Sequence, residues 1–374
     1  MSLRILQLNS ARLYIGEAAH TLNLTEALRQ AGHQVWLGLR SGHLTIEVAR
    51  RRKLEPIEFE MRRRWWPPGE LPDMRKLAKL VREEGIQVVH VHRGREHWQA
   101  ALTAQLFRLG VPIVRTRHVV TPLKRHWANR WLARRTAKLI VVSRAVEADV
   151  RSTRLYRDED VAFVPGGIDL EHFRAKGRRD EMRTKLGLAT DAPVAICVAR
   201  FAKVKAHRIL LEAWDRVRRE VPKAMLLLVG DGLLRAESEA QANRLGLTAG
   251  EVRFLGWQSG EDLPGWLEAS DVGVLTSVGS EGFSRAVLEY LALQLPVVAT
   301  RVGAVPDLVT EGVSGRLVPP GDAGALAAAL SETLRWPPER RAEMGRAGRA
   351  KAENEHGYAA WARTHVHLYE DVLR

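Results

Sequence analysis

The chain has 374 residues, of which 45% are hydrophobic, so about two domains are expected and a peptide scaffold or a mostly disordered protein is excluded. Its 58 lysine and arginine residues outnumber 44 acidic residues, which gives a net charge of +14. The single cysteine, Cys197, excludes an internal disulfide, and no Cys and His stand at metal-ligand spacing, so no structural zinc is expected.

The first half of the chain alternates short apolar runs with amphipathic stretches, which predicts repeated β-α-β units. Strands are expected at residues 3–8, 34–39, 86–91, 112–115, 138–142 and 161–164. Helices are expected at residues 18–31, 73–84, 96–109, 124–135 and 144–152. The first strand follows Met1 almost at once, and no apolar run approaches the ~20 residues of a spanning helix, so neither a signal peptide nor a membrane span is expected.

A second series of strands is expected at residues 193–199, 225–230, 252–255, 272–275, 296–299 and 315–318. This order predicts an α/β fold with two doubly wound parallel sheets. The polar stretch Asp169–Arg183, preceded by Gly166 and Gly167, is predicted to be the linker, which gives domains of residues 1–165 and 166–355. Ligands of such sheets bind beyond the carboxyl ends of the strands, so the functional residues are expected in the loops that follow strands.

The positive charge is unevenly distributed: residues 1–165 hold 30 basic and 16 acidic side chains, whereas residues 166–374 hold 28 of each. Two basic clusters lie in the first half, the second running into tryptophans: Arg50, Arg51, Arg52 and Lys53, then Arg62, Arg63, Arg64, Trp65 and Trp66. Each basic side chain near an anionic bilayer contributes on the order of 1 kcal/mol, and tryptophan prefers the headgroup level, so this patch suits an anionic membrane surface. The alternative is a solvated basic face. Nucleic acid is not expected, because no recognition motif accompanies the charge.

Two glutamates stand eight positions apart after the expected strand 272–275. Glu281 lies in a glycine-bearing loop, and Glu289 is the only charged residue between Arg285 and Arg301. A lone carboxylate among apolar side chains needs hydrogen bonds, which the hydroxyls of a ribose supply. Eight residues at helical rise span about 12 Å, comparable with the distance from ribose to sugar across a diphosphate. The pair is therefore predicted to hold the two ends of one nucleotide sugar.

Anion-binding features accompany the glutamates. The backbone N–H groups of Gly282, Phe283 and Ser284 lie at the start of the expected helix, where anions bind readily. Arg200 ends the strand 193–199 and Lys205 follows it, so the two cations suit a diphosphate, with solvated loop cations as the alternative.

Two residues of the first half also follow strands. Gly16 opens the first helix, as a close approach of the backbone to phosphate requires. His118 follows the strand 112–115, and for a lone histidine a structural role is the alternative.

Taken in order, these motifs resemble a family-4 retaining glycosyltransferase of the two-domain GT-B fold. The matching segments of the second half are VARFAKVKAH (198–207), LLLVGDG (226–232), VRFLG (252–256), EGFSRAVLE (281–289) and VGAVPDLVTEGVSGRLVPPGD (302–322). Those of the first half are VVHVHR (88–93), LIVVSRA (139–145) and PGGIDLEHF (165–173). The chain departs from the family at Gly166, where Asn is usual, and at Ile15 and Ala206, where Gly is usual.

The resemblance implies a role for each residue. Glu281 orients the donor sugar with the amides of Gly282, Phe283 and Ser284, Glu289 holds the ribose, and Arg200 and Lys205 neutralise the departing diphosphate. Phe254 and Leu255 lie on the nucleotide side, His118 contacts the sugar from the first domain, and Gly16 approaches the phosphate. The helix 356–374 is expected to pack back on the first domain, which binds the acceptor.

The resemblance further implies a UDP- or GDP-linked hexose donor, retention of configuration and no enzyme nucleophile. No Asp-x-Asp motif stands in a donor loop, so neither a metal nor any cofactor beyond the nucleotide sugar is expected. The expected acceptor is a glycan or glycolipid of cell-envelope polysaccharide or lipopolysaccharide assembly, and the expected location is cytoplasmic, peripheral on the inner face of the membrane. The alternatives are a nucleotide-sugar epimerase of the same fold and a non-catalytic protein that binds carbohydrate or nucleic acid.

Overall fold

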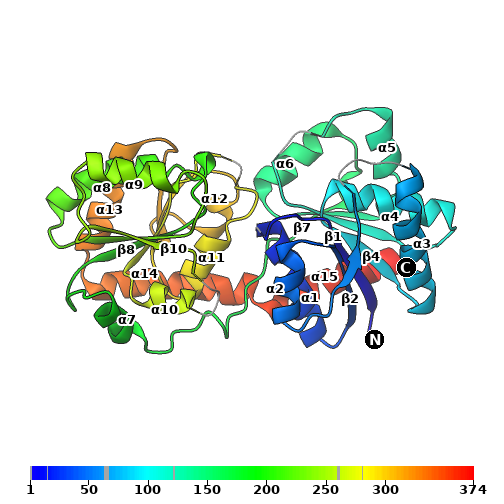
Figure 1. The fold of residues 1–374 in the computed structure, drawn as a ribbon, viewed down its shortest axis with the longest axis horizontal. Helices are drawn as coiled ribbons and strands as arrows, with labels where there is room; N and C mark the ends of the chain where they lie inside the picture. Colours follow the sequence, from blue (N-terminus) through cyan, green and yellow to red (C-terminus); the bar gives the residue numbers. More distant parts are fainter. Residues whose placement is uncertain (1, 15, 63–66, 121–122, 259–261, 280) are drawn as a thin grey trace. The chain divides into compact units, whose positions relative to one another are not determined.

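The computed structural model describes residues 2–14, 16–62, 67–120, 123–258, 262–279 and 281–374. The chain forms two compact units, each drawn in Figure 1. The first unit comprises Met1–Gly167 together with His356–Arg374, and the second comprises Ile168–Glu355. Among the described helices, none combines the length and the apolar character that crossing a bilayer requires.

The first unit is built on a parallel sheet with the strand order β3-β2-β1-β4-β5-β6-β7. Its strands are β1 (Arg4–Asn9), β2 (Gln34–Arg40), β3 (Ile57–Phe59), β4 (Val88–Val91), β5 (Ile113–Arg117), β6 (Lys138–Val141) and β7 (Val161–Phe163). Its helices are α1 (Gly16–Gln30), α2 (Leu44–Arg51), α3 (Pro67–Glu83), α4 (Gly94–Leu106), α5 (Trp127–Ala133), α6 (Arg144–Thr153) and α15 (Tyr358–Leu373).

Alternating residues of the central strands bury their side chains on opposite faces of this sheet. On one face, Leu6 and Leu8 of β1 join a core with α3 and α4. On the other face, Ile5 joins a core with α1 and α15, where Trp361 and Tyr369 are fully buried. Gly167 is required here, because a Cβ atom on it would lie 2.2 Å from the Trp361 ring. The last helix of the chain thus completes the core of the first unit.

The second unit is built on a six-stranded parallel sheet with the order β10-β9-β8-β11-β12-β13. Its strands are β8 (Val194–Val198), β9 (Met225–Val229), β10 (Val252–Gly256), β11 (Val272–Leu275), β12 (Val297–Thr300) and β13 (Gly315–Val318). Its α-helices are α7 (Arg179–Lys185), α8 (His207–Glu220), α9 (Arg235–Arg244), α10 (Leu263–Glu268), α11 (Arg285–Ala292), α12 (Val305–Leu308), α13 (Ala323–Arg335) and α14 (Pro338–Lys351).

Both faces of the second sheet are covered. In Figure 1, α8, α9 and α13 lie over one face, and α7, α10 and α14 lie over the other. The buried side chains follow the same division: Cys197 packs with α8 and α13, whereas its neighbour Ile196 packs with α7, α10 and α11. The prediction of two doubly wound parallel sheets in an α/β fold is therefore confirmed.

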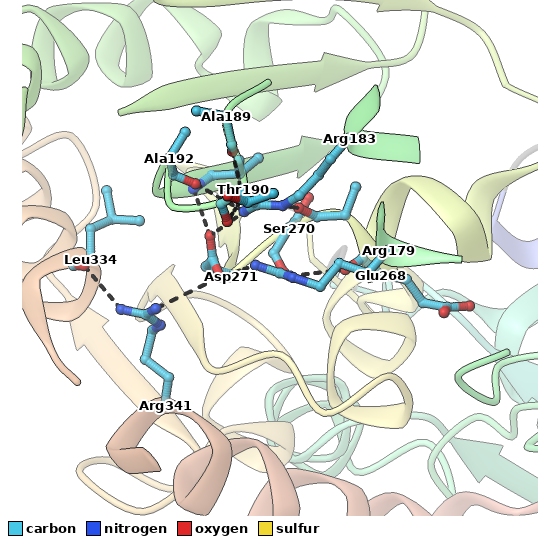
Figure 2. Close-up of polar contacts among 12 residues, drawn as sticks. Arg179, Arg183, Ala189, Thr190, Ala192, Glu268, Ser270, Asp271, Leu334 and Arg341 are labelled. Atoms are coloured by element: carbon cyan, nitrogen blue, oxygen red, sulfur yellow. Dashed lines mark hydrogen bonds and ion pairs between the residues drawn. The ribbon is translucent and has the colours of Figure 1, made fainter. Parts of the chain in front are cut away.

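The stretch Asp169–Arg183 is not simply a linker, contrary to the prediction. Arg183, a buried residue of α7, donates to the carboxylate of Asp271 at 2.9 Å and to four backbone carbonyls of the second unit. Figure 2 shows that Arg179 and Arg341 converge on the same carboxylate, at 2.6 and 3.8 Å. The prediction of a linker failed because a stretch rich in charged residues is typical of an exposed segment. Burial of the Arg183 side chain is favourable only because Asp271, distant in the sequence, and four backbone carbonyls accept its hydrogen bonds.

Candidate functional site

The candidate donor site lies at the carboxyl edge of the second sheet, where β8 and β11 are adjacent. The loop after β8 carries Arg200 and a short 3-10 turn, Lys203–Lys205, and the loop after β11 carries Glu281. Parallel strands end at the same edge, so loops far apart in sequence meet there. Lys205 and Glu281 are 76 positions apart and form an ion pair.

Glu281 is held in place by two side chains. Its side chain is 4% exposed, and one carboxylate oxygen accepts hydrogen bonds from Lys205 Nζ and from Ser277 Oγ. Burying a carboxylate without such hydrogen-bond partners is costly, so these contacts stabilise its position. Ser277 was not among the residues expected from the sequence, because a serine in a loop carries no signal of its own.

Hydrogen bonds to backbone carbonyls fix the two loops relative to each other. Thr276 Oγ1 donates to the carbonyl of Lys205 at 2.8 Å, and the Val278 N–H donates to the carbonyl of Val204 at 2.9 Å. Beneath Glu281, the Ala304 N–H donates to the Glu281 carbonyl at 2.8 Å. The charged groups are therefore carried by a bonded framework rather than by free loops.

Gly303 is a site residue that the sequence reasoning missed. Its φ is +52°, and a Cβ atom there would lie 1.9 Å from the carbonyl oxygen of Glu281. Only glycine permits both that backbone conformation and that approach. Gly303 lies in the segment 302–322 that resembles the family. The need for glycine at this position can be recognised only when its neighbour, the Glu281 carbonyl, is known.

Glu289 lies in α11, and its side chain is 6% exposed. Its carboxylate accepts a hydrogen bond from Arg285 Nη2 at 3.0 Å, one turn earlier. The buried carboxylate therefore has a partner within its own helix, in addition to any ribose. At the start of the same helix, Gly282 and Ser284 are buried and Phe283 is half-buried.

Arg200 is exposed, and its side chain makes no hydrogen bond or ion pair with any of the described residues. The neighbouring Phe201 is buried, and its N–H donates to the carbonyl of Asp231 in the LVGDG loop at 3.0 Å. Gly232 of that loop has a φ of +153°, and a Cβ there would lie 2.5 Å from the Phe201 carbonyl. These contacts position the backbone of Arg200 and leave its guanidinium available to an anion.

Phe254 and Leu255, the residues expected on the nucleotide side, lie in β10 and are partly buried. The Phe254 ring stacks near that of Phe201, with centroids 5.9 Å apart. Leu255 packs against the core on the opposite face, and its carbonyl accepts from the Gln258 side chain at 2.6 Å.

Ala206 adopts a left-handed conformation, with φ +49° and ψ +42°, between the 3-10 turn and α8. Glycine adopts this conformation without strain, whereas alanine does not. The departure from glycine noted in the sequence therefore falls at a strained position next to Lys205.

His118 follows β5 in the first unit and lies within a group of histidines. Its Nε2 is 3.2 Å from His92 Nδ1, and its ring centroid is 4.6 Å from that of His20. Burial, followed by the charges of Arg115 and Arg93, lowers the pKa of His118 to about 3. The side chain is therefore neutral at physiological pH and serves as a hydrogen-bonding group rather than as a cation.

One ring nitrogen from each of His20, His92 and His118 lies within 4.8 Å of the other two, a spacing from which three imidazoles can hold a metal ion. The positive charges of Arg93 and Arg115 act on the same group and oppose a further cation. Sequence reasoning missed this group because its members come from α1 and from the loops after β4 and β5.

Gly16 is the first residue of α1 and is exposed. An added Cβ atom would meet nothing within 4 Å, so the fold itself does not require glycine there. The next residue, Glu17, forms an ion pair with Arg93.

The basic clusters near residues 50 and 62 are only partly available to a membrane. Arg52 was predicted to join that surface, and this is wrong: its guanidinium pairs with Glu26 and donates to Asn23 at 2.8 Å. Arg50 is exposed and pairs with Glu58 at 2.6 Å. Three other members, Arg51, Lys53 and Arg62, are exposed, whereas Arg63, Arg64, Trp65 and Trp66 lie outside the described residues.

An open cavity of about 800 Å³ lies at the other edge of the second sheet, lined by Arg179, Arg183, Asp271 and Arg341 among others. The residues before β8, β11 and β12 form its wall, so it faces the amino ends of the strands. The arginines are occupied with Asp271 and with backbone carbonyls (Figure 2). We therefore assign this cavity a structural role and place the candidate site at the opposite edge.

Two family models match the chain, one in each half. The model of Glycosyltransferase Family 4 matches residues 16–172, and that of Glycosyl transferases group 1 matches residues 192–335. A D-inositol 3-phosphate glycosyltransferase of Saccharomonospora viridis is 34% identical over 335 residues, which cover 79% of this chain and 74% of the relative.

Solved structures show the same fold at low sequence identity. A glycosyltransferase from Rickettsia africae has a TM-score of 0.88 at 18% identity, over 100% of this chain and 99% of its own. HepE (Alr3699) of Anabaena, in complex with UDP and glucose, has a TM-score of 0.83 at 21% identity, over 98% of this chain and 99% of its own.

Proposed function

The chain belongs to glycosyltransferase family 4 and has the GT-B fold, and from this premise we propose that it transfers a hexose from a nucleoside diphosphate sugar to an acceptor hydroxyl with retention of configuration. The observation that carries the proposal is the charged group at the carboxyl edge of the second sheet. There a buried acid, Glu281, lies against the cation Lys205, with the exposed Arg200 in the same loop as the lysine.

The proposed role of Glu281 is to accept hydrogen bonds from hydroxyls of the donor sugar. The amides of Gly282, Phe283 and Ser284 at the start of α11 complement negative charge on the donor. Glu289, whose carboxylate Arg285 orients, accepts from the ribose hydroxyls. Phe254 and Leu255 lie on the nucleotide side.

During transfer, the bond between the anomeric carbon and the diphosphate oxygen breaks, and a bond from that carbon to the acceptor oxygen forms on the same face. The acceptor proton passes to the departing diphosphate, so no enzyme nucleophile takes part. Arg200 and Lys205 stabilise the charge that develops on the leaving group, an effect that often exceeds about 2 kcal/mol for each interaction. We propose that this chemistry needs neither a metal nor another cofactor.

In the first unit, His118 donates or accepts a single hydrogen bond to the sugar in its neutral form, and Gly16 lets the start of α1 approach the phosphate. HepE, which has the same fold, binds UDP and glucose, so a UDP-linked hexose is the first donor to test and a GDP-linked one the second. The proposed acceptor is a glycan or glycolipid of envelope polysaccharide or lipopolysaccharide assembly. Arg50, Arg51, Lys53 and Arg62 would then hold the cytoplasmic enzyme at an anionic membrane.

The donor is identified by thermal shift with UDP, GDP and their hexose conjugates, with and without EDTA. Binding to the native state raises the melting temperature by linkage. We expect Glu281→Ala and Glu289→Ala to abolish most of the shift, while Glu339→Ala, an exposed glutamate on α14, leaves it unchanged.

Transfer to acceptors from an envelope extract is then followed by NMR of the product anomeric proton. An inverted anomer would refute the proposed stereochemistry, and a shift that requires a divalent metal would refute metal independence. Epimerised free donor without transfer would indicate an epimerase, and binding that Glu281→Ala leaves intact would refute the assigned site.

A further inference from the structure

Polar side chains take the place of apolar ones on one face of the first sheet. Gln7 of β1 and His90 of β4 are register partners, two positions after Ile5 and Val88. Side chains alternate along a strand, so both polar residues face the core that α1 and α15 complete, to which Ile5 and Val88 belong. Gln7 and His90 are fully buried, and a buried polar group requires a hydrogen-bond partner.

These buried groups belong to one continuous chain of hydrogen bonds that ends at His118. His118 Nε2 lies 3.2 Å from His92 Nδ1, and His92 Nε2 lies 2.6 Å from Gln7 Oε1. At the other end of the amide, Gln7 Nε2 donates to the Tyr369 hydroxyl at 3.5 Å, and that hydroxyl lies 2.7 Å from His90 Nδ1. Tyr369 belongs to α15, so the last helix of the chain is connected to His118.

This chain of hydrogen bonds has a direction, because its three histidines are neutral. Burial lowers the pKa of His90 and of His92 well below the ordinary value, as it lowers that of His118. A neutral imidazole donates through one ring nitrogen and accepts through the other. Each ring must therefore donate on one side and accept on the other, and one group of known polarity decides the direction for all of them.

The Gln7 amide fixes that direction. Its oxygen, which can only accept, faces His92 Nε2, so Nε2 carries the proton and His92 Nδ1 is the acceptor. His118 must therefore donate to His92 from Nε2 and keep a lone pair on Nδ1. His118 is partly exposed, and its Nδ1 forms no hydrogen bond with any of the described residues.

The far end of the chain of hydrogen bonds agrees with this direction. The Gln7 amide nitrogen donates to the Tyr369 hydroxyl, which must then give its own proton to His90 Nδ1. Burial raises the pKa of Tyr369, so the hydroxyl keeps a proton to donate. His90 donates in turn from Nε2 to Thr116 Oγ1 at 2.7 Å. Every donor from Thr116 to His118 is thus matched with an acceptor.

The His118 ring is also held in place by its neighbours. It stacks on His92, with centroids 5.5 Å apart and planes 25° apart, and meets His20 in a T-shaped contact at 4.6 Å. The backbone N–H of His92 donates to Glu96 Oε1 at 3.2 Å, which anchors the loop after β4. The ring therefore has a fixed orientation and one accepting nitrogen, at the carboxyl edge of the first sheet, where ligands bind.

We propose that Gln7 and His92 are positioning residues that hold His118 with its proton on Nε2, so that Nδ1 accepts a hydrogen bond from a hydroxyl of the donor sugar. The inference rests on the proposed function for the identity of its partner, a nucleotide sugar, and adds the direction of the contact. The sugar substituent that meets His118 must donate a proton. A hydroxyl does so, whereas a fluorine or a carboxylate would face the lone pair without a proton, so the site selects against both.

The first test reads which ring nitrogen of His118 is protonated, by long-range ¹H–¹⁵N correlation at neutral pH in protein labelled with ¹⁵N-histidine and without donor. The His118→Ala spectrum assigns the signals. We expect a protonated Nε2 and an unprotonated Nδ1 in the wild type. The opposite tautomer would mean that the Gln7 amide is turned over, and it would overturn the proposal.

Two variants test whether the chain of hydrogen bonds sets this tautomer. Gln7→Met keeps the length of the side chain without the amide, and His92→Phe keeps a ring beside His118 without the acceptor. In each we expect an admixture of the Nδ1–H tautomer, seen as the two ¹⁵N shifts of His118 moving towards each other. The control is His365→Phe, because His365 is equally buried but bonds to the Trp361 carbonyl. Unchanged shifts in both variants, or the same change in the control, would overturn the positioning role.

The second test uses only the wild type and His118→Ala, so it does not depend on the folding of the Gln7 and His92 variants. Monodeoxy and monodeoxyfluoro analogues of UDP-glucose, or of the GDP hexose if thermal shift selects it, are titrated by calorimetry. At one sugar position we expect both analogues to bind the wild type at least about tenfold more weakly than the parent donor, and to bind His118→Ala as the parent does.

A fluorine that retains the affinity lost by the deoxy analogue would show that His118 donates, and would overturn the proposal. The absence of any position that depends on His118 would do the same while leaving the proposed function standing. Failure of UDP and GDP hexoses to bind at all would refute the proposed function and with it the sugar contact. The tautomer of His118, read without donor, would still decide whether Gln7 and His92 position the ring.

Discussion

Replacing Gly303 by alanine tests whether this residue builds the donor site. The new Cβ atom would lie 1.9 Å from the Glu281 carbonyl oxygen, a distance that no real contact tolerates, so the Glu281 loop must move. Alanine at a φ of +52° costs about 1–2 kcal/mol by itself. Displacement of the loop also breaks the 2.8 Å hydrogen bond from Ala304, worth about 1 kcal/mol, and disturbs the buried pair of Lys205 and Glu281.

The expected loss in the free energy of unfolding is therefore about 2–4 kcal/mol. Gly312→Ala is the matched control, because Gly312 has a φ of +74° with nothing within 4 Å of its added Cβ. The control should lose only the backbone contribution, about 1–2 kcal/mol. The difference between the two variants isolates the contact with Glu281.

Urea denaturation measures both free energies, and calorimetric titration with the nucleotide sugar found by thermal shift measures affinity. We expect Gly303→Ala to bind the donor at least about tenfold more weakly, and Gly312→Ala to bind it as the wild type does. Equal destabilisation and equal donor affinity in the two variants would refute the argument that Gly303 positions Glu281.

Three further predictions concern stability. Asp271→Asn removes the charge that Arg183 faces in a buried pair, so the free energy of unfolding should fall by about 3–5 kcal/mol. A loss of less than about 1 kcal/mol in urea denaturation would contradict this prediction. Burial lowers the pKa of His365 to about 4 and that of His118 to about 3. Because the unfolded chain binds protons at these histidines near pH 6.5, the free energy of unfolding should fall as the pH drops from 6.5 towards 4, by up to ~1.4 kcal/mol per pH unit for each histidine. His365→Gln should make the free energy of unfolding depend less on pH in this range. Ala206→Gly relieves a left-handed alanine and should raise stability by about 0.5–1 kcal/mol, seen by calorimetry as a higher melting temperature.

Much of the fold could be predicted from the sequence, because each element depends on its own neighbours. The expected strands 272–275 and 315–318 match β11 and β13, and most other strands differ by one or two residues at an end. The short strand β3 and helix α2 were not predicted, since three and eight residues are too few for a repeating pattern to be recognised in the sequence. These two elements are stabilised mainly by the sheet they join.

The residue types of the candidate donor site could also be predicted, because glutamates, cations and glycines recur after strands and parallel strands end at one edge. The sequence alone thus determined the family, the α/β architecture and the loops in which the charged residues stand. It did not determine their partners, as Ser277 and Gly303 show: each acts on Glu281 through a contact that only the folded loops create.

Tertiary structure decided which charges that are distant in the sequence are paired. Arg52 reads as part of a basic surface but pairs with Glu26 from α1, whereas Arg12 and Arg40, unremarkable in the sequence, have no acidic partner among the described side chains. The physical reason is the short range of these interactions: a salt bridge or hydrogen bond acts over a few ångströms, and residues distant in sequence come within that range only when the sheets assemble.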